Sequence, residues 1–303
     1  MGKVIQIGTR ESQLALWQAN TVKGLLHQNG YTAELVHIKS EGDTDLTTPL
    51  YELGVQGIFT KALDIALLNG DIDIAVHSMK DVPTQMAKGI VQSAVLPRAS
   101  YKDLLVLKKG ASFSDGAGVH TIATSSIRRK AQWLNRYPND MIENLRGNVN
   151  TRMRKVEESD WNGAIFAAAG LERIGLRPET AIELDWMLPA PAQGAIIVVC
   201  RDGDKYCLDA CAHFHDADTA LCTSIERDFL RALMGGCSTP ISAFATVADG
   251  MVKFIGNILS TDGTQKKEIT KTVMRDEANG LGQAAAQELL STGGQQILDG
   301  FKR

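Results

Sequence analysis

Short apolar runs and amphipathic stretches alternate along the first third of the chain. Residues 4–8 and 33–38 are apolar enough for strands, and residues 13–27 between them space their apolar positions as a helix does. Helical spacing over 60–69 then leads to a β-branched run at 72–76. This order predicts a βαβ opening in an α/β domain, with 72–76 as a buried strand of a parallel sheet.

A second α/β series follows, with strands predicted at 103–107, 121–123, 141–145 and 163–168 and helices at 126–136 and 151–159. Proline-marked crossings flank it at 96–100 and 188–194, and a further apolar run covers 195–200. We therefore expect two similar α/β lobes joined by two crossings, one formed by 1–96 with 195–215 and the other by 99–190.

The pattern changes after the second crossing. A helix near 221–234 precedes three alternating runs at 241–247, 251–259 and 266–273, and a last helix is predicted over 277–290. Asp249-Gly250 and Asp262-Gly263 mark hairpin turns between the runs. We expect 218–303 to be a small C-terminal α+β domain.

Composition narrows the class of protein. The chain has 303 residues, of which 44% are hydrophobic, and its net charge of −3 gives no general attraction to nucleic acid or to anionic membranes. Its longest apolar run, 195–200, is too short to cross a bilayer, and the first residues lead into a strand without the apolar core of a signal peptide. Five cysteines without a framework spacing fit reduced thiols. We expect a cytoplasmic protein.

The strand at 72–76 runs into His77, Ser78, Lys80 and Asp81, and Pro83 stops the ladder. Ligands of open α/β sheets collect beyond the carboxyl ends of strands. Lys80 and Asp81 allow two interpretations. They are a surface ion pair of little energetic value, or an ionised carboxylate beside an ammonium at a site that handles both a proton and an anion.

Arginines occur three times where a strand passes into a helix, at Arg10, at Arg128-Arg129 and at Arg152. The helix dipole disfavours cations at this end, so a bound anion would explain them, with Ser125 or Ser126 as the helix cap. Residues 120–155 hold eight basic and two acidic residues. A solvated basic face is the alternative. The absence of a Walker motif, and of a GxGxxG motif after the first strand, leaves a nucleotide cradle without support. The several separated arginines instead predict a small ligand with several acidic groups.

Cys237 stands in a tight Gly-Gly-Cys-Ser-Thr-Pro loop, a setting in which a thiolate can act as nucleophile, although a lone loop cysteine is more often incidental. A second group suggests a metal site by residue type: Cys207, Cys211, His213, His215 and Cys222. Its spacing contains no CxxC pair, so we expect no metal.

Six motifs in order resemble the hydroxymethylbilane synthase (porphobilinogen deaminase) family, at residues 9–18, 75–83, 124–129, 145–152, 193–195 and 235–237. The resemblance implies two lobes like those of type II periplasmic binding proteins, with a double crossover, and a third domain. It implies a transferase of tetrapyrrole and heme biosynthesis, usually monomeric, that carries a dipyrromethane cofactor on Cys237 by a thioether. Four porphobilinogens are joined head to tail with loss of ammonia, and hydrolysis releases hydroxymethylbilane.

The same resemblance assigns the residues. Asp81, with Lys80, is implied as the catalytic group at the pyrrole N–H, where it would stabilise positive charge and move protons. Phe59 would cover the pyrroles at the end of the long 41–59 loop. Binding of the acetate and propionate groups, or contact with the cofactor, is implied for Arg10, Ser12, Ser78, Lys80, Thr124, Ser125, Arg128, Arg129, Arg146, Asn148, Arg152, Gln193 and Gly194.

The sequence departs from the usual family pattern at Val55, Gln56, Ala62 and Ala192, the last standing where glycine is common. Two other classes of protein are kept as alternatives. A polyanion receptor would share the lobes but has no use for Cys237. A nucleic-acid binder would use residues 120–155, where the aromatic side chains are limited to Trp133 and Tyr137.

Overall fold

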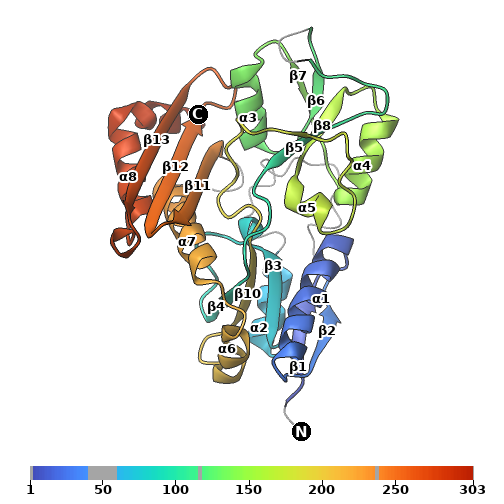
Figure 1. Ribbon diagram of the computed structural model, residues 1–303, viewed down its shortest axis with the longest axis vertical. Coiled ribbons are helices and arrows are strands. Elements are labelled where there is room, and N and C mark those ends of the chain that lie inside the picture. Colours follow the sequence, from blue (N-terminus) through green and yellow to red (C-terminus); the bar gives the residue numbers. More distant parts are fainter. Residues whose placement is uncertain (1–2, 40–59, 115–117, 236–238, 303) are drawn as a thin grey trace. The chain divides into compact units, whose positions relative to one another are not determined.

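The structure is a computed structural model that describes residues 3–39, 60–114, 118–235 and 239–302 (Figure 1). Its described residues form two compact units: 3–39, 60–99 and 194–220 make the first, and 100–193 with 221–302 make the second. Within these residues, no helix is both long and apolar enough to cross a membrane.

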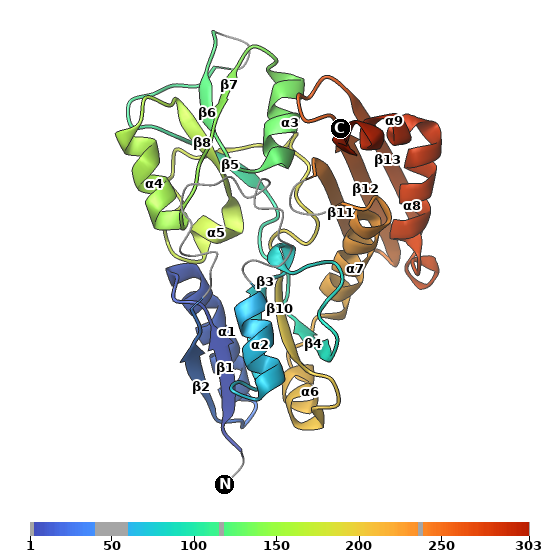
Figure 2. The same cartoon turned by 180° about the vertical axis from the view of Figure 1, so that it is seen from behind.

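The first unit is built on a mixed five-stranded sheet with the order β2-β1-β3-β10-β4. β10 runs antiparallel to both of its neighbours, whereas β1 is parallel to β2 and to β3. Helices α1 and α6 share one apolar core with the sheet, and α2 covers the opposite face (Figure 2). The elements are β1 (Ile5–Thr9), α1 (Gln13–Gln28), β2 (Ala33–His37), α2 (Lys61–Asn69), β3 (Ile74–Ser78), the short 3-10 turn η2 (Met79–Asp81), β4 (Ile90–Val95), β10 (Ile196–Arg201) and α6 (Lys205–Ala212).

The second unit contains a sheet of the same plan, with the order β7-β6-β8-β5-β9. In each sheet the strand that enters directly after a crossing, β10 or β5, inserts antiparallel at the fourth position. The elements are β5 (Asp103–Leu107), β6 (Thr121–Ala123), α3 (Ile127–Arg136), β7 (Met141–Glu143), α4 (Val149–Glu158), β8 (Gly163–Ala167), α5 (Ala168–Glu172) and β9 (Ile182–Glu183).

The rest of the second unit is an antiparallel three-stranded sheet covered by helices. Asp249 and Gly250 both have positive φ, as the predicted two-residue turn requires. Gly263 lies so close to α3 that a Cβ there would come within 2.5 Å of the Ala131 carbonyl oxygen. The elements are α7 (Ala217–Ala232), β11 (Ile241–Ala248), β12 (Met251–Leu259), β13 (Lys266–Met274), η3 (Arg275–Glu277), α8 (Leu281–Leu289), the kinked turn η4 (Leu290–Gly294), α9 (Gln295–Asp299) and η5 (Gly300–Lys302).

The predicted fold class is confirmed: two α/β lobes with a double crossover and a small C-terminal α+β part. The residue boundaries expected for three domains stay a prediction. Several element boundaries were wrong. β3 runs through His77 and Ser78 rather than ending at 76, because β10 supplies antiparallel partners for both residues, and the sheet is mixed rather than parallel. β4, α5, β9 and α9 were missed, and the helix predicted over 277–290 is α8, which starts late, after Gly280 in a left-handed conformation.

Asp73 ties the start of β3 to other strands of the first sheet. Its carboxylate, 5% exposed, accepts hydrogen bonds from the Gln6 amide, Lys3 and Arg201. Burial acts to raise the pKa of Asp73, but these donors outweigh it and the pKa lies below its ordinary value. Asp73 therefore contributes stability above the unfolded-state pKa of about 3.9, and this is lost as pH falls through the folded pKa.

We predict that Asp73→Asn lowers the free energy of unfolding at pH 7 by about 1–3 kcal/mol. Urea denaturation measures the difference, which should shrink toward acid pH because the wild-type carboxylate is then protonated as well. Asp71→Asn, an exposed neighbour, is the control and should change little. A difference between wild type and Asp73→Asn that is constant with pH would contradict this assignment.

Candidate functional site

The predicted residues of the first unit lie at one edge of its sheet. β1 and β3 are parallel neighbours, paired at Gly8 and Ala75, so their carboxyl ends meet. Arg10 follows β1, Ser78 ends β3, and Lys80 and Asp81 lie on η2, all of them half-buried. This edge of the sheet thus carries the Asp81 carboxylate together with the cations Arg10 and Lys80.

Two serines of this edge are held by the protein itself. Ser12 caps α1, and its Oγ accepts a hydrogen bond from the Ala15 amide at 3.3 Å. The Oγ of Ser78 accepts from Nε2 of the buried Gln18 at 2.8 Å. These bonds fix the entry to α1 relative to the end of β3.

The polar residues of the second unit gather in the same way, beyond the parallel strands β6 and β7. Ser126, not Ser125, caps α3, while the buried Ser125 donates its hydroxyl hydrogen to the Leu145 carbonyl. The Thr124 Oγ1 accepts from the Ser126 amide at 3.2 Å. These bonds tie the start of α3 to the strand exits.

Three further predicted residues follow β7. Arg146 is 3% exposed, so it is a buried cation. Asn148 caps α4 by accepting from the Thr151 amide at 2.9 Å. The Nε of Arg152 donates to the Gly147 carbonyl at 2.8 Å. The start of α4 is therefore fixed by the side chains that were predicted to bind ligand.

Asp103, which sequence reasoning missed, organises the arginine pair of α3. This completely buried carboxylate opens β5, and its Oδ2 accepts from Nη2 of Arg128 at 2.7 Å. Its Oδ1 accepts from Nε and Nη2 of Arg129 at 3.0 and 2.7 Å and from Nε2 of Gln193 at 3.0 Å. The available signal was a charged residue at the head of an otherwise apolar strand, Asp-Leu-Leu-Val-Leu.

The two arginines differ in how many of their guanidinium nitrogens are hydrogen-bonded within the protein. All three nitrogens of Arg129 donate within the protein, since Nη1 bonds the Ile165 carbonyl at 2.9 Å. In Arg128, Nη1 donates to the Leu188 carbonyl, but the buried Nε has no partner among the described residues. An internal carboxylate thus explains the position of Arg129. Its predicted role in binding ligand stays a prediction.

Two guanidiniums share one carboxylate, which leaves a net positive charge in a buried cluster. Burial lowers the pKa of Arg128, and the repulsion from Arg129 adds to this, whereas Asp103 opposes both. An anionic ligand group would relieve the excess charge.

The second crossing is tied to this cluster. Gln193 also donates from Nε2 to the Tyr101 carbonyl at 2.8 Å. The preceding Ala192 has a left-handed φ of 61°, which explains physically why glycine suits this position. Its amide donates at 2.6 Å to Glu226, a completely buried carboxylate of α7 that also accepts from the Ala245 amide.

Four of the five cysteines lie in the described residues, and all four are buried. Burial raises the pKa of Cys200 to about 11 and that of Cys211 to about 12, and it raises the pKa of Cys207 as well. These thiols are therefore poor nucleophiles at neutral pH.

The last predicted residues are the Cys and His group considered for a metal, the cofactor cysteine and the lid residue. No group of His, Cys, Asp or Glu in the described part of the chain is arranged to hold a metal, and His215 accepts from the Val95 amide instead. Cys237 and Phe59 lie outside the described residues.

Comparison with known proteins decides the family. Residues 5–209 match the model described as "Porphobilinogen deaminase, dipyromethane cofactor binding domain", and residues 220–291 match the C-terminal domain of the same family. The chain belongs to the porphobilinogen deaminase family. It is 43% identical over 298 residues to porphobilinogen deaminase of Syntrophotalea carbinolica, covering 97% of this chain and 95% of that one.

A plant relative and a solved structure extend the comparison. The chloroplastic porphobilinogen deaminase of Pisum sativum is 41% identical over 303 residues, with 96% of this chain and 82% of that one covered. The methionine-binding protein MetQ is similar with a TM-score of 0.44 and 13% identity, over 71% of this chain and 91% of that one.

The residues present fit a dipyrromethane. The pyrroles of this family carry acetate and propionate groups, and the Asp103 cluster holds one more guanidinium than it has carboxylates, with Nε of Arg128 buried and unbonded among the described residues. Such a cluster suits a ligand carboxylate better than a neutral group.

We predict that Asp103→Asn lowers the free energy of unfolding by about 3 kcal/mol, because it leaves two buried guanidiniums without an anion. Urea denaturation at pH 7 measures this. Asp185→Asn is the matched control, since Asp185 pairs with Lys102 at the surface and exposed pairs contribute about 0–1 kcal/mol. Equal losses in the two variants would contradict a central role for Asp103.

Proposed function

We propose that this chain joins four porphobilinogen molecules head to tail with loss of ammonia and then releases hydroxymethylbilane by hydrolysis. The family membership supplies the reaction, and the observation that carries the assignment is the buried excess positive charge around Asp103. A growing chain of pyrroles with acidic side groups is a polyanion. The excess positive charge around Asp103 would attract it.

Asp81 is the proposed catalytic residue. Loss of ammonia leaves positive charge on the substrate pyrrole, and a carboxylate near the pyrrole N–H would stabilise that charge and accept a proton. Lys80 follows the same strand end and Arg10 the neighbouring one, so both can bind the acidic side groups. The half-burial of Asp81 on η2 keeps the carboxylate accessible to a ligand.

The remaining proposed residues fall into two groups, those that bind the ligand directly and those that hold other groups in place. The buried Arg128 and Arg146 are the foremost candidates for carboxylate binding, with the half-buried Arg152 at the same edge. Arg129, Gln193, Ser125 and Asn148 act by holding backbone and side chains in place through the bonds described above. Ser12, Ser78, Thr124 and Gly194 complete the set, and Phe59 is proposed as the residue that covers the pyrroles.

Cys237 is the proposed attachment site of the dipyrromethane, through a thioether. The support is chemical, since the other four thiols are buried and three of them have raised pKa values. When bound, the cofactor supplies the terminal pyrrole carbon on which the product is built. We also propose that the protein works as a monomer in the cytoplasm, without nucleic-acid or membrane partners.

We predict that purified wild-type protein has an intact mass above that of its sequence by two pyrrole units. Cys237→Ser should show the sequence mass alone and no turnover, because it has no thiolate to alkylate. Cys222→Ala, which removes a buried thiol, should keep the adduct. An adduct that persists in Cys237→Ser would overturn the attachment site, and an unmodified but active wild type would overturn the cofactor.

We predict that Asp81→Asn lowers kcat by a factor on the order of 10² or more, because an amide cannot accept the proton. The adduct and the urea midpoint should be unchanged, and Asp81→Glu should recover part of the activity. Steady-state assays with porphobilinogen measure this. Near-normal turnover in Asp81→Asn would remove Asp81 from the mechanism.

A further inference from the structure

His77 is a buried polar residue that the proposed chemistry does not use. It lies on β3 next to Ser78, and because side chains alternate along a strand, Ser78 faces α1 while His77 faces the side covered by α2. Its side chain is almost wholly buried, and Nε2 has no hydrogen-bond partner among the described residues. Such buried polar atoms are nearly always bonded in folded proteins, either to the protein or to water.

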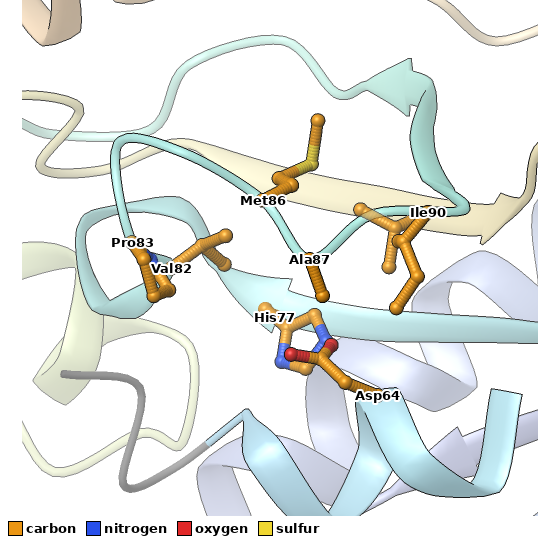
Figure 3. Close-up of a pocket in the computed structure, with 8 residues that line it drawn as sticks. Asp64, His77, Val82, Pro83, Met86, Ala87 and Ile90 are labelled. Atoms are coloured by element: carbon orange, nitrogen blue, oxygen red, sulfur yellow. The ribbon is translucent and has the colours of Figure 1, made fainter. Parts of the chain in front are cut away.

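The His77 ring faces a small cavity (Figure 3). Asp64 extends from α2 toward the ring, and these two residues are the polar side chains of the lining. The remaining lining residues are apolar: Val82, Pro83, Met86, Ala87, Ile90 and Val199. The cavity has room for about one water molecule, and a buried water needs at least two polar partners, which an imidazole and a carboxylate provide.

The ionisation of the two side chains suits a bridging water. Burial, together with the smaller effect of the nearby Arg10 charge, lowers the pKa of His77 to about 4, so the imidazole is neutral at pH 7. Burial raises the pKa of Asp64, and the hydrogen bond from Thr60 opposes this. A neutral imidazole offers one donor and one acceptor, so a water can join it to Asp64 in either tautomer.

The roof of the cavity begins where the proposed catalytic turn ends. Val82, which lines the cavity, directly follows Asp81, and its amide donates to the Met79 carbonyl at 3.2 Å to close η2. The Met79 amide in turn donates to the Ala195 carbonyl at 3.0 Å. The cavity wall formed by Val82 and Pro83 is thus continuous with the turn that carries Lys80 and Asp81.

We propose that His77 and Asp64 hold one buried water beneath the 82–90 segment, and that His77 is by this means a positioning residue for the turn that carries Lys80 and Asp81. The proposal rests on the proposed function, because its effect is read as turnover of porphobilinogen. It differs from a simple packing role in one respect. An apolar ring of similar size would satisfy packing but would displace the water.

The test compares His77→Phe with His77→Gln in cofactor-loaded protein. His77→Phe displaces the water and fills its space with an apolar ring, so we expect a urea midpoint close to that of wild type together with a fall in kcat of about tenfold from misplacement of Asp81. His77→Gln restores a polar group and should return kcat to within about twofold of wild type. Met86→Leu, in the same cavity wall, should leave kcat unchanged.

A double-mutant cycle tests the shared water. If one water serves both side chains, Asp64→Leu with His77→Phe should lose no more kcat than the more damaging single change. Additive losses would refute the shared water. A kcat for His77→Phe equal to wild type, or a fall in kcat and urea midpoint together that His77→Gln does not restore, would refute the positioning role. Wild-type turnover in the same assay separates failure of this inference from failure of the proposed function.

Discussion

The buried carboxylate of Asp103 is the interaction on which the second unit depends. It joins the first residue of β5 to the first turn of α3 through two guanidiniums, and to the second crossing through Gln193. Charges removed from water are costly unless they are paired, so these partners must stay together for the unit to fold. The pairing is incomplete, because the cluster that holds the unit together contains one more positive charge than negative charge.

A second buried carboxylate, Glu226, holds the same crossing from another direction. It accepts hydrogen bonds from the amides of Ala192 and Ala245. Ala192, whose left-handed conformation costs conformational energy, is thereby fixed to α7 and to β11. The crossing is thus bonded at successive residues, Ala192 by Glu226 and Gln193 by Asp103. These two residues of the crossing are therefore held by hydrogen bonds to the second unit and do not form a free linker.

Burial sets the reactivity of side chains elsewhere by the same rule, since it disfavours whichever form is charged. It keeps the thiols of Cys200, Cys207 and Cys211 protonated and the imidazole of His77 neutral. These three thiols are therefore unreactive at neutral pH. A neutral His77 can serve as a hydrogen-bonding partner without adding charge beside Arg10.

Local patterns in the sequence determined the fold class, the Asp249-Gly250 turn, and the arrival of Arg10, Lys80 and Asp81 at strand ends. This worked because apolar alternation, turn residues and the edge rule for parallel strands act over a few neighbouring positions. Only the tertiary structure decided that Ser126 caps α3, that His77 belongs to β3, and that Arg129 is neutralised by Asp103. Each of these outcomes depends on a partner outside that local range. Ser125 is held by the Leu145 carbonyl 20 positions away, His77 pairs with a strand that returns more than a hundred residues later, and Arg129 meets a carboxylate 26 positions away. No local periodicity records which distant group will meet a buried charge.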